Sequence, residues 1–520
     1  MPSSGAAVPG RRQFLAGLAA AGAGGLAACG SAPGPRPASP RRRYGGNLRV
    51  GLTGGSSSDT LDPHQGLSYL DTARASALYE PLIQLAPDAM TEYVLAREIT
   101  PGNRAATRWV IRIRPDVVFH DGKPLTAADV IYTFRRIITN KYSGAHVLGP
   151  VDPAGLTALD KLTVLVPMTR PYATLPEQLA SILTAQIVPD GFTAASRPNG
   201  TGPFTFRSFT PGQRSVFTRN TRYWQHGLPC AGTLTIIDFP DKTSLSDALV
   251  TGQVDAAGTL DGPQIATLAN ASGVIPVPSP AGTIIPFTMR VDQAPFNDVR
   301  VRQALRLAVD RPQLIDSALD TYGRVASDVF SPYDPDFDAA LTRQQDIPQA
   351  KFLLKKAGKE GLKVTLVTSP IATGTVAMAT VLAEQAKAAG IDITIRQVDP
   401  GTFFGPGYLQ WPFAQDFYSY APYLAQCTLS MLPASPWNEC HFSDPDYTRL
   451  YGQANATLDA ALRKEIIYRM QQIDYTEGGY IIPAFTDTLD AYSARVTGWK
   501  PSRVGQPVND LNFAALAFTS

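Results

Sequence analysis

The sequence predicts a mixed α/β protein built from at least two lobes. Strand-like and helix-like segments alternate along the chain. Residues 363–398 hold a complete strand–helix–strand unit, in which "KVTLVT" and "IDITIRQV" flank a helical stretch that stops at Gly390. That spacing suits a right-handed crossover between two parallel strands. About 470 residues follow the N-terminal segments, and hydrophobic cores stop growing at roughly 250–300 residues, so a single core cannot hold the chain.

The chain begins with the features of an export signal. Arg11 and Arg12 precede an uncharged stretch, 14–28, made almost entirely of Ala, Gly and Leu, which ends at Cys29. A membrane-spanning helix needs about 20 strongly apolar residues, so this stretch is too short to be one. A positive start, a short apolar core and a small-residue end predict a signal peptide over residues 1–28. The alternative is a buried N-terminal helix that ends in a core cysteine.

Two details refine the kind of signal. The arginine pair followed by "FL" after one residue resembles the twin-arginine export signal, and "LAAC" at 26–29 resembles a bacterial lipobox, in which Cys29 becomes the lipidated first residue. Residues 29–46 are rich in Pro, Gly, Ser and Arg and predict a flexible tether. We therefore expect a protein held by lipid on the extracytoplasmic face of a bacterial membrane, in the periplasm or on the cell surface.

Charge separates the tether from the globular body. The whole chain has a formal charge of +2, and removing Arg11 and Arg12 with the signal leaves about zero. The tether holds Arg36 and Arg41–Arg43 and no acidic residue, so the body is near −4. A mildly acidic body gives no support for nucleic-acid binding. The tether arginines either lie against anionic lipid headgroups or are solvated linker charges.

Individual elements can be placed in order. Residues 47–53 and 107–114 alternate as strands do. Residues 125–138 predict a helix, with Thr126 as N-cap and Asp129 three residues later in an acidic variant of the capping box. A second helix follows Asp298 within 296–315, and "DRP" at 310–312 breaks and restarts it. A helix over about 458–473 precedes the strand-like "GYIIPAF" at 479–485.

Three cysteines follow Cys29: Cys230, Cys427 and Cys440. An exported protein can keep disulfides, and Cys427 and Cys440 bracket a 12-residue loop. We therefore expect a Cys427–Cys440 disulfide, with Cys230 free. Three cysteines without a CxxC spacing disfavour a zinc site.

Motifs for a chemical reaction are not found in the sequence. No two of the five histidines have the i, i+4 spacing of a metal-binding helix, and neither GxSxG nor SxxK occurs. "NGTGPF" at 199–204 lacks the remaining residues of a phosphate loop and predicts a turn. His120 stands beside Asp121, but the Asp-Gly pair that follows indicates a turn rather than an acid–base site. We expect no catalytic residue, metal or cofactor.

Five motifs in order carry a family resemblance. They are "TLDPHQG" (60–66) with "LYEPLIQL" (78–85), "WVIRIRPDVVFHDGKPLTAADVIYTFRRI" (109–137), "GTGPFTFRSFTPGQRSVFTRNTRYW" (200–224), "APFNDVRVRQALRLAVDR" (294–311) and "DIPQAKFLLKKAG" (346–358). Together they resemble the extracellular solute-binding proteins of the oligopeptide/dipeptide ABC transporter family. The resemblance covers about residues 47–500.

The resemblance implies a fold and a way of working. The expected fold is a two-lobed periplasmic-binding-protein type II-like fold: lobe I over 47–286 with an extra subdomain at about 85–195, lobe II over 287–485, and a C-terminal segment, 486–520, that returns to lobe I. It also implies a monomer that captures its ligand by hinge closure. The ligand is then delivered to a membrane permease driven by ATPase subunits.

Peptides are the ligand class that the resemblance implies, bound largely through backbone contacts. In the family an acidic residue commonly pairs with the peptide's α-ammonium. Aligned on Tyr420, "DFYSYAPY" (416–423) places Ser419 at that position, and a shifted alignment gives the role to Asp416. Position along the chain adds further expected ligand-binding residues: Tyr69, Phe287, Trp411, Tyr420 and Trp437. The alternative for each aromatic is core or interlobe packing, and for Ser419 a solvent-facing loop.

Two other functions remain open beside peptide import. The solute could be a non-peptide, such as an oligosaccharide or a metal chelate, or the protein could be a surface receptor that senses peptides without transport. A cell-surface hydrolase is disfavoured because no convincing nucleophile–base pair is present.

Overall fold

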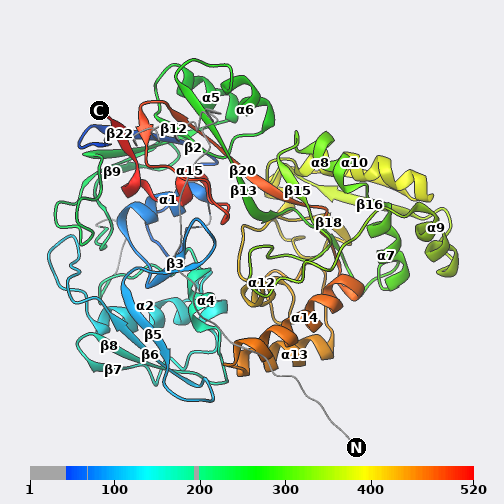
Figure 1. The fold of residues 1–520 in the computed structure, drawn as a ribbon, viewed down its shortest axis with the longest axis horizontal. Coiled ribbons are helices and arrows are strands. Elements are labelled where there is room, and N and C mark those ends of the chain that lie inside the picture. Colours follow the sequence, from blue (N-terminus) through cyan, green and yellow to red (C-terminus); the bar gives the residue numbers. More distant parts are fainter. Residues whose placement is uncertain (1–41, 67, 193–197) are drawn as a thin grey trace, which may run out of the picture. The chain divides into compact units, whose positions relative to one another are not determined.

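The structure is a computed structural model that describes residues 42–66, 68–192 and 198–520, which belong to one compact unit. Helices and strands are mixed along the chain (Figure 1), which confirms the predicted α/β class. The predicted signal residues Arg11 and Arg12 and the predicted lipid anchor Cys29 lie outside the described residues.

An eight-stranded mixed sheet is the largest sheet. Its strand order is β13-β20-β12-β2-β11-β10-β9, with β15 beside β20. The central strand β2 is the predicted strand at 47–53, and it has parallel neighbours on both sides, β11 and β12. The bounds are β2 Asn47–Thr53, β9 Phe204–Thr210, β10 Arg214–Arg219, β11 Thr233–Phe239, β12 Ala256–Ala257, β13 Val274–Ile284, β15 Gly323–Val325 and β20 Ala484–Ser493.

The antiparallel pair β13–β20 contains an irregularity. Ser279 pairs with Thr488 and Thr283 pairs with Thr486, so three residues of β13 stand opposite the single residue Asp487. This is an extended β-bulge. The unpaired stretch bonds elsewhere: the Gly282 amide donates to the Arg503 carbonyl oxygen at 2.8 Å.

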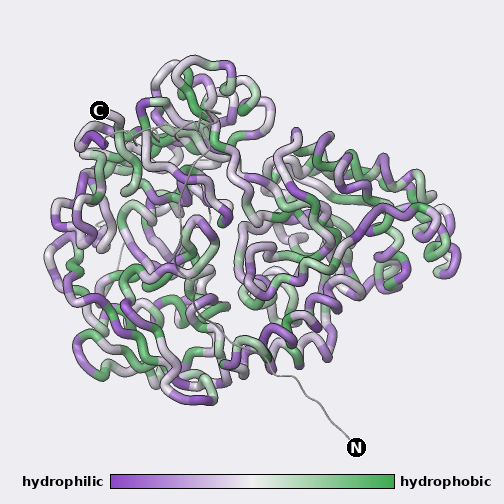
Figure 2. Tube along the Cα trace, viewed as in Figure 1, coloured by the Kyte–Doolittle hydropathy of each residue, from purple (hydrophilic) through white to green (hydrophobic). Residues whose placement is uncertain are grey.

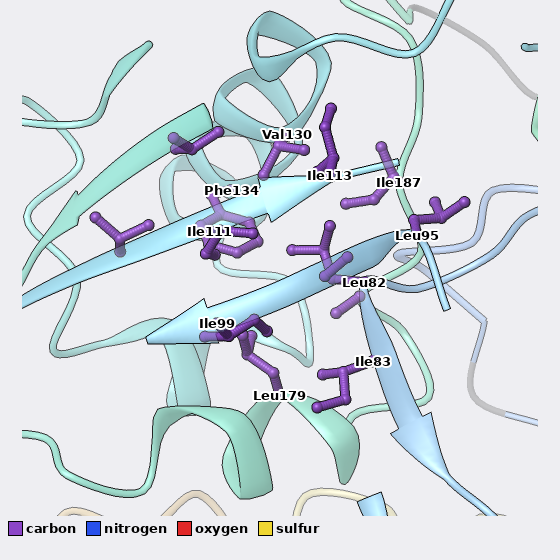
Figure 3. Close-up of a cluster of buried hydrophobic side chains, with 14 of the residues drawn as sticks. Leu82, Ile83, Leu95, Ile99, Ile111, Ile113, Val130, Phe134, Leu179 and Ile187 are labelled. Carbon is purple, nitrogen blue, oxygen red and sulfur yellow. The ribbon is translucent and has the colours of Figure 1, made fainter. Parts of the chain in front are cut away.

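A four-stranded antiparallel sheet, β5-β6-β8-β7, has its own hydrophobic core. Helix α2 (Ala127–Thr139) packs on it, and the predicted capping box is present: Asp129 accepts from the Thr126 amide at 2.8 Å. Figure 3 shows Val130 and Phe134 of α2 directed at Ile111 and Ile113 of β6. The bounds are β5 Ala96–Pro101, β6 Arg108–Ile113, β7 Thr157–Asp160 and β8 Thr163–Pro167, with the nearby hairpin β3 Ile83–Leu85 and β4 Thr91–Tyr93.

Two further small sheets lie within residues 287–483. The sheet β18-β14-β19 contains β14 Phe287–Met289, β18 Phe413–Gln415 and β19 Tyr480–Ile481. The parallel pair β16 Lys363–Thr368 and β17 Asp392–Gln397 is joined through α10, as the strand–helix–strand pattern predicts. Gly390 ends the helical stretch with φ +80°, a conformation that glycine adopts without strain.

The remaining helices include the predicted ones. The break at "DRP" separates α7 from α8, and Asp298 and Asp310 cap their N-termini. The bounds are α1 Tyr69–Leu78, α3 Ala145–Leu148, α4 Leu175–Ala180, α5 Lys242–Val250, α6 Gly262–Leu268, α7 Val299–Ala308, α8 Arg311–Ala318, α9 Ile347–Lys356, α10 Thr375–Ala386, α11 Pro400–Phe403, α12 Tyr423–Ser430, α13 Pro445–Ala456, α14 Ala460–Glu477 and α15 Pro507–Asp510.

Separate hydrophobic cores underlie these sheets. One core joins the eight-stranded sheet to α1 and the chain's last strands, and another joins β14 to α7, α8 and α10. We call residues 42–284 with 486–520 the large-sheet region, and residues 287–483 the small-sheet region; β15 lies within the second range but pairs with β20 of the large sheet. The predicted lobe and subdomain boundaries stay a prediction.

Hydrophobic and hydrophilic residues are interspersed along the described chain (Figure 2). Across residues 42–66, 68–192 and 198–520, no helix combines the length and the apolar character that a membrane crossing requires.

Two sequence predictions are corrected. Arg42 and Arg43, predicted to lie in the tether, form β1, which pairs with β22 (Ala517–Thr519); β22 in turn pairs with β21 (Val496–Thr497). The pairing gives the β1 backbone hydrogen-bond partners that a tether would take from water.

The predicted Cys427–Cys440 disulfide is absent, because both cysteines are free and buried, as Cys230 is. The two thiols have different neighbours. Cys427 Sγ lies 3.1 Å from the Tyr447 hydroxyl, whereas Cys440 packs closely on Gly479.

Candidate functional site

The large-sheet and small-sheet regions meet at a group of neutral hydrogen-bonding side chains. Ser419 follows β18 in the small-sheet region, and its side chain lies beside that of Tyr69, the first residue of α1. The Gln506 amide, from the C-terminal segment, donates to Ser419 Oγ at 3.0 Å. Two predicted ligand-binding residues, Tyr69 and Ser419, are thus brought into direct contact. We call Tyr69, Ser419 and Gln506 the polar junction.

Gln506 keeps unused hydrogen-bonding capacity in the polar junction. Its side chain is 4% exposed, and its Oε1 atom has no hydrogen-bond partner among the described residues. A buried polar atom without a partner costs free energy on the order of 1–3 kcal/mol. Functional sites are one place where such atoms persist, because a ligand can supply the missing donor.

The backbone of α15, directly after Gln506, is strained and departs from right-handed helical geometry. Val508, Asn509, Asp510 and Leu511 all have positive φ, between +47° and +60°. The left-handed conformation costs roughly 1–2 kcal/mol per residue, and it is rare for a β-branched residue such as Val508. Runs of this kind persist only where the surroundings impose them, and they cluster at binding sites.

Two buried carboxyls lie at this left-handed turn. Asp490 of β20 lies beside the backbone of Val508 and Asn509, and Asp510 accepts from the Gln506 amide at 3.3 Å. Burial raises the pKa of Asp490 to about 8 and that of Asp510 to about 6. Burial also raises the pKa of Tyr69, and the neighbouring Ser419 hydroxyl offsets part of that rise. At neutral pH, Tyr69 and Asp490 are therefore mainly uncharged beside the polar junction.

Tyr420 lies beside the polar junction and is buried. Its amide donates to the Val504 carbonyl oxygen at 3.0 Å, and its ring meets Tyr333 edge to face at a centroid distance of 5.9 Å. A side chain on Gly282 would meet the Tyr420 ring at 2.7 Å. Tyr420 therefore packs against the bulge of β13, and its predicted contact with ligand stays a prediction.

Asp416 is the alternative to Ser419, and both of its carboxylate oxygens already have hydrogen-bond donors within the protein. It is buried, and its carboxylate accepts from the Tyr408 hydroxyl at 2.7 Å and from the Phe417 amide at 2.8 Å. Burial raises its pKa, and the pKa of the neighbouring Glu439 is raised by burial as well. Because these partners use its oxygens, the structure favours Ser419 over Asp416 as the residue that faces the large-sheet region.

Trp411 lines a small cavity next to Asp416 and Glu439. The cavity volume is about 10 Å³, room for about one water molecule. The Trp411 ring stacks on Phe403 with centroids 6.2 Å apart, and its Nε1 donates to the Phe403 carbonyl oxygen at 3.2 Å. These contacts fit the packing alternative for Trp411.

Trp437 takes part in a second contact between the regions. Its ring lies edge to face with His146 of α3, at a centroid distance of 5.7 Å. Burial lowers the pKa of His146 to about 4, so the ring is neutral at physiological pH. Nearby, the Thr174 hydroxyl donates to Asn455 Oδ1 at 2.8 Å. The predicted ligand role of Trp437 stays a prediction. Its observed contact is with His146 of the large-sheet region.

Phe287 is a core residue. Its side chain is fully buried on β14, and its ring lies 6.5 Å from that of Phe413. A ring enclosed by the hydrophobic core of the small-sheet region has no face for a solute, so we remove Phe287 from the candidate site.

The sequence matches a known family over more than half of its length. Residues 95–423 match the family described as bacterial extracellular solute-binding proteins, family 5, middle part. The chain belongs to this family. Its members are extracytoplasmic solute-binding proteins of ABC importers.

Relatives agree with this assignment. The glutathione-binding protein GsiB of Escherichia coli is 26% identical over 465 residues, which cover 86% of this family 5 protein and 90% of GsiB. These relatives are solute-binding proteins rather than enzymes.

Solved structures show the same fold. AgaA of A. tumefaciens R10, in complex with agropinic acid, superposes with a TM-score of 0.79 at 21% identity, covering 91% of this chain and 99% of AgaA. DppA of Helicobacter pylori, in complex with the peptide STSA, has a TM-score of 0.79 at 19% identity, covering 92% and 99%. The fold is therefore that of the type II periplasmic binding proteins.

Sequence reasoning missed several residues of these contacts. Gln506, His146 and the Thr174–Asn455 pair were not singled out. The "GQP" triplet at 505–507 was the available signal, because glycine and proline around one polar residue indicate a constrained turn. Nothing in the local sequence indicates that the turn meets Ser419, about 90 residues earlier.

Proposed function

We propose that this family 5 protein captures peptides at the polar junction and delivers them to an ABC permease with its ATPase subunits. The observation that carries the proposal is the meeting of Tyr69, Ser419 and Gln506, with the buried Gln506 Oε1 left unpartnered among the described residues. Neutral donors and acceptors suit the backbone amides of a peptide, which are the same whatever its side chains. The peptide bound to DppA and the name of GsiB support this ligand class.

Closure of two lobes would complete the site. We propose lobe I over 47–286, with its extra subdomain at about 85–195, lobe II over 287–485, and a returning C-terminal segment over 486–520. The contacts from Tyr69 to Ser419 and from Thr174 to Asn455 support this division, because each joins one proposed lobe to the other. A ligand that touches both lobes favours the closed form. Binding by a monomer, without a cofactor, follows from the same proposal.

A non-peptide solute is the second candidate. Ser419 provides a hydroxyl where the family commonly has an acid, so the charge that selects a free α-ammonium is missing at that position. AgaA, which has the same fold, is known in complex with agropinic acid. A peptide-sensing receptor without transport would use the same site, and a permease gene beside this one would favour import.

Native mass spectrometry of the gently purified full chain tests the ligand class. Peptide import predicts a set of added masses that fragment into amino acids. A single non-peptide mass would show that the ligand is a non-peptide solute, the second candidate. The solute-binding role would stand. If the protein is empty, titration with peptides that have free or acetylated N-termini decides, and failure of both sets would exclude peptides.

Export and anchoring belong to the same proposal. The arginine pair Arg11 and Arg12 would direct twin-arginine export, and Cys29 would carry the lipid. We expect Cys29→Ser to release the protein from the membrane fraction, because a chain without its lipid keeps only weak surface contacts. Cell fractionation followed by mass spectrometry of the N-terminal fragment measures this. Continued acylation of the variant would contradict the anchor.

A further inference from the structure

A cationic pocket lies where the predicted tether joins the body. It has a volume of about 510 Å³ and is lined by Arg43, Gly46, Asn47, Arg49, Asp255, Arg495, Phe518 and Thr519. Strands β1 and β2 and the C-terminal strand β22 supply most of these residues. The pocket belongs to the large-sheet region and shares no residue with the polar junction. The solute-binding role does not use it.

Three arginines and one acid give the pocket its charge. Asp255 is 1% exposed, and its carboxylate is saturated: Arg49 Nε donates to Oδ2 at 2.9 Å, Arg49 Nη2 donates to Oδ1 at 2.8 Å, and Arg495 Nη2 donates to Oδ1 at 3.3 Å. One carboxylate cannot neutralise three guanidinium groups. Two positive charges therefore remain on the lining of the pocket.

The arginines are held in place while part of each stays accessible. Asp255 fixes Arg49, whose side chain is 29% exposed, and steadies Arg495, which is 64% exposed. The Arg43 guanidinium lies over the Phe518 ring, 5.6 Å from its centroid. The N–H donors that Asp255 leaves free on these fixed guanidinium groups suit phosphate oxygens.

The position of the pocket along the chain indicates which phosphate it meets. Arg43 belongs to β1, which continues directly from the predicted tether, and residues 29–41 between Cys29 and β1 span at most roughly 40 Å as an extended proline-rich segment. A lipid on Cys29 would thus keep the pocket within reach of the membrane surface. The tether arginines Arg36 and Arg41 would add to the same attraction.

We propose that this pocket binds the phosphodiester headgroup of an anionic phospholipid and thereby docks the large-sheet region on the membrane. The proposal rests on the proposed tethering for its orientation. Binding of the headgroup is a separate property, and a chain without lipid can be used to measure it.

The test uses the full chain with Cys29→Ser, so that an acyl chain does not dominate binding. We expect it to sediment with phosphatidylcholine vesicles that contain phosphatidylglycerol and to bind pure phosphatidylcholine vesicles far less. Arg43→Gln with Arg495→Gln should weaken binding to phosphatidylglycerol about fivefold per arginine removed. Arg43→Lys with Arg495→Lys should retain most of the binding, because the charges remain.

A control pair separates the pocket from general charge attraction. Arg104→Gln with Arg207→Gln removes the same charge at two exposed positions outside the pocket. Equal weakening in both pairs, or no preference for phosphatidylglycerol, would overturn the proposal. Release of the protein from the vesicles by millimolar inorganic phosphate would also overturn it, in favour of a small-anion site. A thermal shift on adding a solute reports on the polar junction separately. Loss of solute binding and loss of headgroup binding therefore give different results.

Discussion

Ser419 determines the charge of the polar junction. Its hydroxyl lies beside Tyr69 and accepts from Gln506, and neither neighbour carries a charge. A hydrogen bond between neutral groups contributes about 1 kcal/mol, and one to a charged group about twice as much. The residue at position 419 therefore decides how strongly a ligand's ammonium group is selected.

Replacing this hydroxyl by a carboxylate should change ligand preference. We expect Ser419→Asp to increase the preference for peptides with a free N-terminus over their acetylated forms by about tenfold, because the new charge pairs with the ammonium. Isothermal titration with matched peptide pairs measures the ratio. Ser419→Asn adds a similar volume without charge, and an equal change in that variant would show that size rather than charge is responsible.

Asp328 is the central residue of a buried ion cluster. Its carboxylate lies 3.0 Å from Arg311 Nη2 and 2.5 Å from Arg343 Nε, with Arg306 at 3.9 Å. Burial alone would raise the pKa of Asp328, but the arginines outweigh it and hold the pKa below its ordinary value. Arg306 also donates to the carbonyl oxygens of Asp474 and Gly478, so the cluster binds the C-terminal end of α14.

Removing that carboxylate should destabilise the small-sheet region. We expect Asp328→Asn to lower the free energy of unfolding by about 3–5 kcal/mol, because buried arginines lose their counter-charge. Asn accepts the positive φ of +65° at this position, so the backbone is not the cause. Urea unfolding measures the change. Asp446→Asn, which breaks an exposed pair with Arg449, is the control and should have little effect.

The left-handed turn at 508–511 is the element on which the polar junction depends. Asp490 is buried beside this turn, Asp510 accepts from the Gln506 amide, and burial raises the pKa of Asp490 to about 8. A carboxyl whose pKa is raised in the folded state binds its proton more tightly there than in the unfolded chain. Its contribution to stability is complete below the unfolded pKa of about 4 and is lost as the pH rises through about 8.

Asp490→Asn should therefore flatten the dependence of stability on pH. Between about pH 4 and 8 the wild-type melting temperature should fall more steeply than that of the variant. In this range unfolding of the wild type releases the proton of Asp490, and the variant has no such proton to release. Differential scanning calorimetry over this range measures both slopes. Asp392→Asn, at an exposed position of β17, should leave the slope unchanged. A variant slope equal to the wild-type slope would contradict the role of Asp490.

Elements with local signals were predictable, and contacts between distant segments were not. Thr126 with Asp129, the "DRP" break and the strand–helix–strand unit are determined by residues within a few positions of one another, and all are found. The prediction of a Cys427–Cys440 disulfide is wrong, because it used sequence spacing and not tertiary packing. Cys427 lies beside Tyr447, whereas Cys440 packs on Gly479. Gln506 was missed for the same reason: its partner is determined by tertiary packing.

For the whole molecule, the proposed closure would depend on contacts between the two regions. The Thr174–Asn455 bond joins them away from the polar junction, and Thr174 makes no side-chain capping bond to α4. Such a contact would stabilise the proposed closed form at a place away from the polar junction. Its loss lowers the closed population, and the apparent affinity falls with it.

Thr174→Val should thus weaken solute binding from a distance. The change keeps the shape and removes one hydrogen bond of about 1 kcal/mol, so we expect about fivefold weaker binding. Titration calorimetry gives the affinity, and small-angle scattering without ligand should show a more open average. Thr448→Val, whose hydroxyl bonds within its own region to the Asp444 carbonyl oxygen, should change neither quantity. Unchanged affinity in Thr174→Val would show that this contact does not stabilise the closed form.

The bulge in β13 has a mechanical consequence. The ribbon formed by β13 and β20 resists bending through its ladder of hydrogen bonds, and the ladder is interrupted where three residues face Asp487 alone. We therefore expect this ribbon to bend most readily at that point. Rotation of one end of the ribbon against the other would concentrate its elastic cost in Pro280, Ala281 and Gly282, leaving the ladders on either side intact.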